Sequence, residues 1–267
     1  MINKTSLDSL CGGLAYAIGV LPPSLAAEAN QDLIKYLDAS FKNEKADRIF
    51  MYNPDAIAQW IFEKYYNMFT PIIKPTDLKL PFCTVMPSVT PVCFGTMYTG
   101  VKPEIHGIKG YVKPVITIET IFDSLIKGGK KVAIISTGKD SMSLIFLNRK
   151  MDYFIFDTID EANRKAKELI IQDEYDFIAL YNGNYDSTMH KFGPESEEAL
   201  LALEHNINAY NEFAALIEKH WKSHNTLLGF AMDHGCHEID GGCGSHGLDM
   251  EEDLNIVHLY RAIKGSL

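Results

Sequence analysis

The sequence predicts an α/β fold in which a mostly parallel central sheet is covered by helices on both faces, without a large cap domain. Short apolar runs alternate along the chain with segments of helical periodicity, an order typical of parallel sheets. Two of these runs, Phe177–Leu180 and Leu227–Phe230, are continuously apolar, as expected for strands buried on both faces. The polar segments that could carry chemistry follow strands, where open α/β sheets place their sites.

The composition is that of a globular protein, since 46% of the 267 residues are hydrophobic and 22% are charged. We expect a single domain over residues 1–267, with residues 1–45 forming a helical extension packed on it. The net charge of −10 argues against a nucleic-acid partner, because such partners bind clusters of lysine and arginine. The five cysteines are odd in number and widely spread, which favours free thiols, a reducing compartment and a cytoplasmic protein.

The first apolar segment, Leu10–Ala27, predicts a packed N-terminal helix followed by a loop. Several glycines and the Pro22-Pro23 pair interrupt it. It is too short to span a membrane, and only one lysine, Lys4, precedes it, so it does not resemble a signal peptide. We therefore expect no membrane partner.

Strands are expected where apolar runs are bounded by turn residues. They are Arg48–Tyr52, Phe82–Met86, Lys131–Ser136, Tyr153–Phe156, Asp176–Tyr181 and Thr226–Met232. The expected helices are Ala56–Phe69, Ile118–Ile126, Ala162–Ile171, Ser196–Trp221 and Glu251–Ile263. Gly128-Gly129 is a stop signal after the second helix, and apolar residues at steps of three and four make the fourth the clearest.

The segment after the fifth strand places Asp186 and His190 four residues apart. On a helical turn this spacing puts a carboxylate and an imidazole on one face, where both can bind one cation. The alternative is a polar loop with an aspartate cap and a surface histidine.

The segment after the sixth strand contains Asp233, His234 and His246, the last flanked by glycines that allow close approach. A structural zinc site is the alternative, with Cys236, Cys243, His237 and His246 as ligands. No CxxC pair supports that alternative. A cysteine nucleophile paired with the adjacent histidine is disfavoured, because adjacent residues rarely present their side chains to each other.

Two further residues follow strands. Thr90 precedes a proline suited to a first helical turn, so it is expected at a helix N-terminus, where anions are favoured. Asp55 follows the first strand and could bind a metal at its end. The alternatives are structural: Thr90 could be an ordinary N-cap, and Asn53, Pro54 and Asp55 could simply begin a helix.

Together these segments resemble the alkaline phosphatase superfamily, specifically its type I phosphodiesterase/nucleotide pyrophosphatase branch. The resemblance covers about Arg48–Ile108 and the part of the chain from Asp176 to the C-terminus. In that family a threonine nucleophile precedes a helix ending in Thr-Gly, followed by Pro-Glu and His-Gly-Ile. The matching residues here are Thr90, Thr99-Gly100, Pro103-Glu104 and His106-Gly107-Ile108. The other family motifs appear as Asp186-Ser187-Thr188-Met189-His190, Asp233-His234-Gly235 and Gly244-Ser245-His246-Gly247.

The resemblance implies two metal sites around a catalytic threonine, Thr90. The ligands of one metal would be Asp186, His190 and His246. The ligands of the other would be Asp55, Asp233, His234 and the Thr90 hydroxyl. The sequence departs from the family at Asn53-Pro54, which precede Asp55, and at Cys93, where many relatives have an asparagine that contacts phosphate. By the same comparison His106 is expected to be structural, and the role of His237 stays open.

The implied activity is metal-dependent hydrolysis of a phosphoric ester, either a phosphodiester or a nucleotide pyrophosphate, through a phosphothreonine intermediate. The cofactors would be two divalent metal ions, zinc being expected for mixed histidine and aspartate ligands and manganese being the alternative. The expected partner is a small phosphorylated substrate, and no oligomeric state is predicted.

Other functions on the same core stay open. They are a phosphonate hydrolase, a phosphomutase, and a non-catalytic binding protein stabilised by metal. A sulfatase is not expected, because Thr90-Pro91-Val92-Cys93 lacks the Cys- or Ser-x-Pro-x-Arg signature. No long insertion is evident between Ile108 and Asp176, so we expect an open site rather than one enclosed by a cap.

Overall fold

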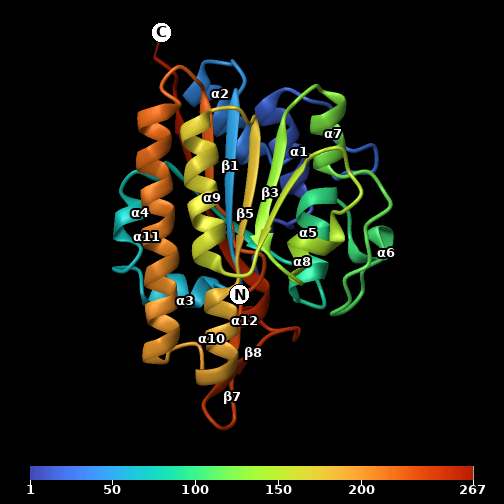
Figure 1. Cartoon of the computed structure of the whole chain (residues 1–267). Coiled ribbons are helices and arrows are strands. Elements are labelled where there is room, and N and C mark those ends of the chain that lie inside the picture. The colour runs from blue at the N-terminus through green and yellow to red at the C-terminus, as the bar shows by residue number, and fades with distance from the viewer. Residues whose placement is uncertain (267) are drawn as a thin grey trace.

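A seven-stranded mixed sheet forms the centre of the computed structural model, which describes residues 1–266 (Figure 1). The strand order is β2-β9-β6-β1-β5-β3-β4. The strands are β1 (Arg48–Pro54), β2 (Leu78–Cys83), β3 (Val132–Thr137), β4 (Asp152–Phe156), β5 (Phe177–Asn182), β6 (Thr226–Phe230) and β9 (Asn255–Ile263). Within this sheet only β9 runs antiparallel to its neighbours, β2 and β6. The predicted fold class, a mostly parallel α/β sheet, is therefore confirmed.

Helices cover both faces of the sheet. In Figure 1, α9 (Ile159–Gln172) and α11 (Glu197–His220) lie in front of it, whereas α1 (Ser9–Ile18) and α2 (Gln31–Phe41) lie behind it. Two helices, α5 (Thr90–Thr99) and α7 (Ile121–Lys127), pack against α1. A third helix, α8 (Ser141–Ile145), packs against α5. The shorter elements are α3 (Gln59–Lys64), α4 (Thr70–Ile73), α6 (Pro103–His106), α10 (Asn184–Phe192), α12 (Glu251–Leu254) and the hairpin of β7 (His237–Ile239) and β8 (Cys243–Ser245).

Local sequence signals set the starts of the long helices. Thr120 and Thr158 each form a capping box with the acidic residue three positions later, at the starts of α7 and α9. Ser196 accepts a hydrogen bond from the Ala199 N–H and caps α11. These caps explain why the three predicted helices occur close to their expected positions.

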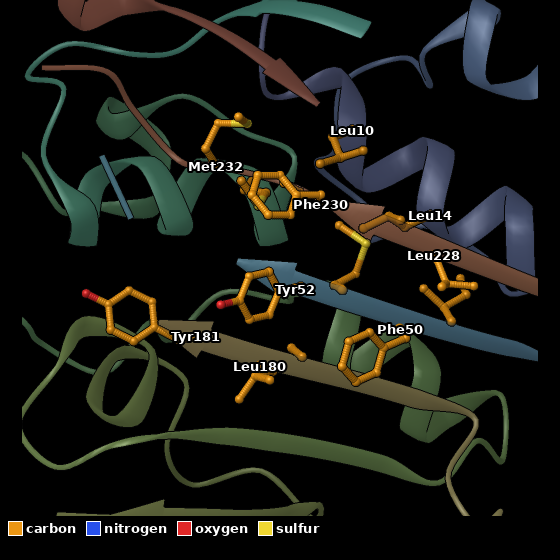
Figure 2. Close-up of a cluster of buried hydrophobic side chains, with 14 of the residues drawn as sticks. Leu10, Leu14, Phe50, Tyr52, Leu180, Tyr181, Leu228, Phe230 and Met232 are labelled. Atoms are coloured by element: carbon orange, nitrogen blue, oxygen red, sulfur yellow. The ribbon is translucent and has the colours of Figure 1, made fainter. Parts of the chain in front are cut away.

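The core is built around β1, whose residues from Ile49 onward are all buried. On the α11 face, the Phe50 ring lies 5.3 Å from that of Phe213, and the Tyr52 ring lies 5.8 Å from the same residue. Figure 2 shows Leu10 and Leu14 of α1 among the buried side chains that gather around the strands. Burial on both faces matches the continuous apolar runs of the sequence.

The predicted helix Ala56–Phe69 is wrong. Ala56 has a φ of 62°, outside the right-handed helical region, and a helix begins only at Gln59. That helix, α3, ends at Lys64, and α4 starts at Thr70. The alternative in which Asn53 begins a helix is also wrong, because this residue belongs to β1. Its buried side chain donates to the Ala231 carbonyl at 2.8 Å.

The predicted helix Glu251–Ile263 is wrong beyond its first turn, since only Glu251–Leu254 is helical and the rest is β9. β9 pairs with β2 on one side and β6 on the other, and its residues up to Tyr260 are buried. A run containing Ile256, Val257 and Tyr260 suits a strand buried in this way.

The second predicted strand is displaced toward the N-terminus. It was expected at Phe82–Met86 and lies at Leu78–Cys83, with Pro81 inside it. Pro81 is tolerated because β2 is at the edge of the sheet and pairs on one side only.

The N-terminal helix α1 is shorter than the apolar segment that predicted it, because it ends at Gly19, a left-handed residue with a φ of 75°. It packs against α2, α5 and α7. Among residues 1–266, no helix has both the length and the apolar character needed to cross a membrane.

Candidate metal centre

Three aspartates meet at the carboxyl ends of three neighbouring strands. Asp55 follows β1, Asp233 follows β6, and Asp186 lies in α10, which begins after β5. Because β1 lies between β6 and β5, the sheet brings the three carboxylates together at the carboxyl ends of these strands. The Asp55 N–H donates to the Asn182 carbonyl at 2.9 Å, and the Ala56 N–H donates to Asp233 Oδ1 at 3.3 Å. These bonds join the ends of all three strands.

Two groups of side chains that can bind a metal form at this end of the sheet. In each group the candidate ligand atoms lie within 4.8 Å of one another. One group is Asp186, His190 and His246, and the other is Asp55, Asp233 and His234. They correspond to the two ligand sets that the sequence resemblance implies. Nothing else between residues 1 and 266 forms such a cluster of His, Cys, Asp or Glu.

The first group combines a helix and a loop. Asp186 and His190 lie one turn apart on α10, with 3.3 Å between Asp186 Oδ1 and His190 Nε2. His246 follows β8, and its Nε2 lies 3.4 Å from the same carboxylate oxygen and 3.1 Å from His190 Nε2. Three atoms that can each donate an electron pair therefore face one point.

All three histidines of the centre are oriented in the same way. The Nδ1 of His190 lies 2.9 Å from the Gly244 carbonyl, that of His246 2.9 Å from the Ser88 carbonyl, and that of His234 2.9 Å from the Gly235 carbonyl. A carbonyl can only accept, so Nδ1 carries the proton in each ring. Each Nε2 then presents its lone pair to the centre, the usual orientation of a metal-binding imidazole.

Each aspartate of the centre has one buried oxygen without a hydrogen-bond partner in residues 1–266: Asp55 Oδ1, Asp186 Oδ1 and Asp233 Oδ2. These oxygens lie between 3.2 and 3.4 Å from imidazole Nε2 atoms. Buried carboxylate oxygens are normally hydrogen-bonded, and leaving them without a partner is costly. A divalent cation among them would satisfy both the carboxylates and the imidazole lone pairs, so the residues fit a metal.

Thr90 is the first residue of α5, at the predicted helix N-terminus. Its side chain is buried in the second group, and its Oγ1 lies 3.3 Å from His234 Nε2. The hydroxyl also donates a long hydrogen bond, 3.4 Å, to Asp55 Oδ2. A hydroxyl oxygen thus lies among the residues that could bind a cation.

Burial dominates the electrostatics of the second group. It raises the pKa of Asp55 to about 7, with a further contribution from the Asp186 charge, and it raises the pKa of Asp233 well above its usual value. Burial and the neighbouring His246 lower the pKa of His234 to about 3. Without a cation, negative charge is unfavourable here and His234 is neutral, and both conditions would be met by binding a metal.

Charge is balanced differently in the first group. Burial alone would raise the pKa of Asp186, but the imidazoles of His190 and His246 outweigh it and hold this pKa below its usual value. In return, the neighbouring Asp186 carboxylate raises the pKa of His190.

Three other residues considered from the sequence have structural contacts. His106 Nε2 lies 3.1 Å from Thr96 Oγ1, in agreement with the structural role expected for it. His237 Nδ1 lies 2.7 Å from Asp253 Oδ1 and is in neither ligand group. The buried Cys93 thiol accepts a hydrogen bond from Thr84 at 3.2 Å.

The alternative structural zinc site is not assembled. Cys243 Sγ donates to the Lys191 carbonyl, and Cys236 is buried with its Sγ 4.0 Å from the Tyr185 hydroxyl. Neither cysteine belongs to a ligand group in the described part of the chain. Burial also raises the pKa of Cys236, which disfavours a thiolate nucleophile.

One residue of the centre was missed from the sequence. Tyr181, near the end of β5, donates a hydrogen bond to Asp55 Oδ2. It occurs inside an apolar run that predicted only a strand, and no spacing in the sequence links it to Asp55. Its contact arises from the pairing of β5 with β1.

No protein-family model and no curated protein matches this sequence. Several solved structures share its fold. Murine ectonucleotide pyrophosphatase/phosphodiesterase 5 is 15% identical with a TM-score of 0.55, and the match covers 73% of this chain and 58% of that chain. The phosphonoacetate hydrolase of Sinorhizobium meliloti, solved with phosphonoformate, is 16% identical with a TM-score of 0.54, and covers 74% and 59%.

A third similar structure is the C-terminal periplasmic domain of the phosphoethanolamine transferase EptC from Campylobacter jejuni, 16% identical with a TM-score of 0.57, covering 81% of this chain and 80% of that domain. These likenesses confirm the alkaline phosphatase-like fold that the sequence resemblance implied. This chain spans less than two thirds of the length of the first two proteins.

Proposed function

We propose that this chain is a two-metal hydrolase of phosphoric esters, acting on a phosphodiester or a nucleotide pyrophosphate with Thr90 as nucleophile. One observation carries the proposal: the buried Thr90 hydroxyl lies within 3.4 Å of Asp55 and His234, in one ligand group, beside a second group of the same chemistry. This is the arrangement that two-metal displacement at phosphorus requires.

The two ligand groups would each hold one cation. Asp186, His190 and His246 would hold one, and Asp55, Asp233, His234 and Thr90 the other. The metals would lower the pKa of a hydroxyl or water and neutralise charge that develops on phosphate oxygens. Nitrogen and carboxylate ligands favour zinc, with manganese as the alternative.

The chain's own residues would divide the work as follows. Asp55 and His234 fix the Thr90 oxygen, which attacks phosphorus in line with the leaving oxygen. The Thr90 hydroxyl loses its proton to solvent, the bond from phosphorus to the leaving oxygen breaks, and that oxygen takes up a proton from solvent. The phosphoryl group is carried on Thr90 as phosphothreonine. Water then attacks phosphorus, the bond from phosphorus to the Thr90 oxygen breaks, and a proton from this water restores the threonine hydroxyl.

The similar structures support this class of substrate. An inactive form of murine ectonucleotide pyrophosphatase/phosphodiesterase 5 is known in complex with AMP. We therefore propose a small phosphorylated molecule as substrate. The phosphonoacetate hydrolase favours phosphonate hydrolysis as a second candidate. The free cysteines support a cytoplasmic location as part of the proposal.

The test compares hydrolysis of bis-p-nitrophenyl phosphate with that of p-nitrophenyl phosphate. Each is measured with and without a chelator, and zinc or manganese is then restored. We expect turnover that the chelator abolishes and a metal restores, with the diester hydrolysed faster. Chelator-insensitive turnover would refute the metal mechanism. A protein that binds two metals but turns over neither ester, nor a phosphonate, would instead be a binding protein.

A further inference from the structure

Tyr181 contacts Asp55 across the boundary between β5 and β1. The Tyr181 side chain is buried, with 7% of the residue exposed, and its hydroxyl donates to Asp55 Oδ2. In residues 1–266 this is the one hydrogen bond that the hydroxyl makes. The tyrosine thus uses its polar atom on one oxygen of a residue that could bind metal.

This hydrogen bond leaves Asp55 with one free oxygen. Asp55 Oδ1 makes no hydrogen bond and lies 3.2 Å from His234 Nε2. Asp233 has the same arrangement, since its Oδ1 accepts from the Ala56 N–H while its free Oδ2 lies 3.4 Å from the same Nε2. Each carboxylate therefore binds the protein through one oxygen and directs the other toward the same imidazole nitrogen.

The surroundings hold the Tyr181 ring in place. The edge of the ring packs against Phe94, with 5.7 Å between ring centroids and 79° between planes. On Gly183, a Cβ would lie 2.6 Å from the Tyr181 hydroxyl oxygen and 3.1 Å from Cζ. Gly183 has a φ of −98°, which any residue can adopt, so this position requires the absence of a side chain next to the hydroxyl.

We propose that Tyr181 is a positioning residue for the metal centre: by occupying Asp55 Oδ2, it presents Asp55 Oδ1 to the cation that Asp233 and His234 also bind. The inference rests on the proposed function in that Asp55 must be a metal ligand. Hydrogen bonds that orient metal-binding side chains typically change metal affinity by about 10- to 100-fold. Tyr181 acts through Asp55 and takes no part in bond making.

The experiment titrates zinc or manganese into the full chain, stripped of metal, by isothermal calorimetry. We expect the unmutated protein to bind two ions. Tyr181→Phe should bind one ion normally and the other about 10- to 100-fold more weakly. Tyr52→Phe is the matched control, because it removes a buried hydroxyl that accepts from Asn182 Nδ2 at 2.8 Å, donates to Asn206 Oδ1 at 3.2 Å and contacts none of the predicted ligands. It should bind both ions with unchanged affinity.

A second variant moves the hydroxyl without removing it. Gly183→Ala should displace the Tyr181 ring from Asp55 and weaken the same ion. Added to Tyr181→Phe, it should weaken that ion much less than it does alone, because the hydrogen bond is already lost. Comparing the single and double variants separates loss of this hydrogen bond from any general effect on α10. If one of the single variants fails to fold, the other still tests the role of the hydrogen bond.

The outcomes distinguish the inference from the function on which it rests. Two ions bound with equal affinity by the unmutated protein and by Tyr181→Phe would overturn the role of Tyr181 alone. Equal weakening of both ions would overturn it as well, since a disturbed fold explains that result. An unmutated protein that binds no metal would overturn the proposed function together with the inference.

Discussion

At the scale of single residues, Thr90 and Asp55 show how this chain could separate metal binding from chemistry. The Thr90 hydroxyl shares its surroundings with His234 and Asp55, but six other side chains complete the two ligand groups without it. Its removal therefore takes away the proposed nucleophile while leaving the six other proposed metal ligands.

Thr90→Ala is expected to keep two metals bound and to lower kcat by about 10⁴-fold or more, as removal of a nucleophile does in other enzymes. Metal content measured beside turnover of the preferred ester checks both parts. Thr96→Ala is the matched control, because Thr96 lies in the same helix, is buried, and contacts His106 instead of a predicted ligand. An active Thr90→Ala variant would show that another group attacks phosphorus.

Two pairs of the predicted site residues could be proposed from the sequence because their spacing is local. Asp186 and His190 are one helical turn apart, and Asp233 and His234 are adjacent, so each pair is visible without knowledge of the fold. Tyr181 has no such signal. Its relation to Asp55 depends on the pairing of Tyr181 with Asn53 in neighbouring strands, which periodicity within one strand does not reveal.

At the scale of elements, β9 links the edge strand β2 to the candidate metal centre. His258 in this strand is buried, and its Nε2 donates to the carbonyl of Met232, the residue before Asp233, at 2.7 Å. On its other side the ring packs on Phe82 of β2, with 4.8 Å between centroids. Burial of this ring disfavours its charged form.

Burial lowers the pKa of His258 to about 4, below its ordinary value near 6.5. The unfolded chain therefore binds more protons than the folded chain between these values. The stability that neutral His258 contributes is fully present above pH 6.5 and is lost as the pH falls toward 4, in total about 3 kcal/mol.

Urea unfolding of the metal-free protein between pH 7 and pH 5 checks this dependence. His258→Gln should lower the stability at pH 7, yet its stability should fall less with acidification than that of the unmutated protein. The difference should approach about 2 kcal/mol at pH 5. Parallel pH profiles would show that His258 is not the group that titrates.

β9 also explains the largest error of prediction. Apolar residues from Leu254 to Tyr260 follow an acidic helical turn, α12, and a short apolar run does not distinguish a strand from a buried helix. What decides the conformation is the open space between β2 and β6, which only the assembled sheet defines. The parallel strands were easier to predict from the sequence, because each is a short apolar run bounded by turn residues.

At the scale of the whole molecule, the fold gathers three carboxylates at one end of the sheet, and two of them are buried. Asp55 and Asp233 are 1% and 0% exposed, and burial raises both of their pKa values. This arrangement costs folding free energy when no cation is present. The fold class was predictable because it needs only the order of elements, whereas this cost depends on distances that the sequence does not state.

Metal binding is therefore expected to stabilise the folded chain strongly. Each site that binds a cation at 100 times its Kd adds about 2.7 kcal/mol, and two sites should raise Tm by roughly 10–20 °C for a chain of this size. Calorimetric melting with chelator and with added zinc measures the effect. Asp233→Asn, which removes one ligand, should show about half of the increase, and an unchanged Tm with metal would contradict binding at this centre.

The position of β9 between β2 and β6 has a consequence for biosynthesis. Ribosomes make the chain from its N-terminus, so β2 is complete long before its single partner strand exists. The parallel strands around β1 can pair earlier, while residues 78–83 keep an unsatisfied edge. Because His258 also supports the backbone beside Asp233, the end of the sheet that holds the candidate ligands becomes complete only after β9 has been translated and inserted. A nascent chain would thus gain the proposed metal binding only once β9 has paired with β6.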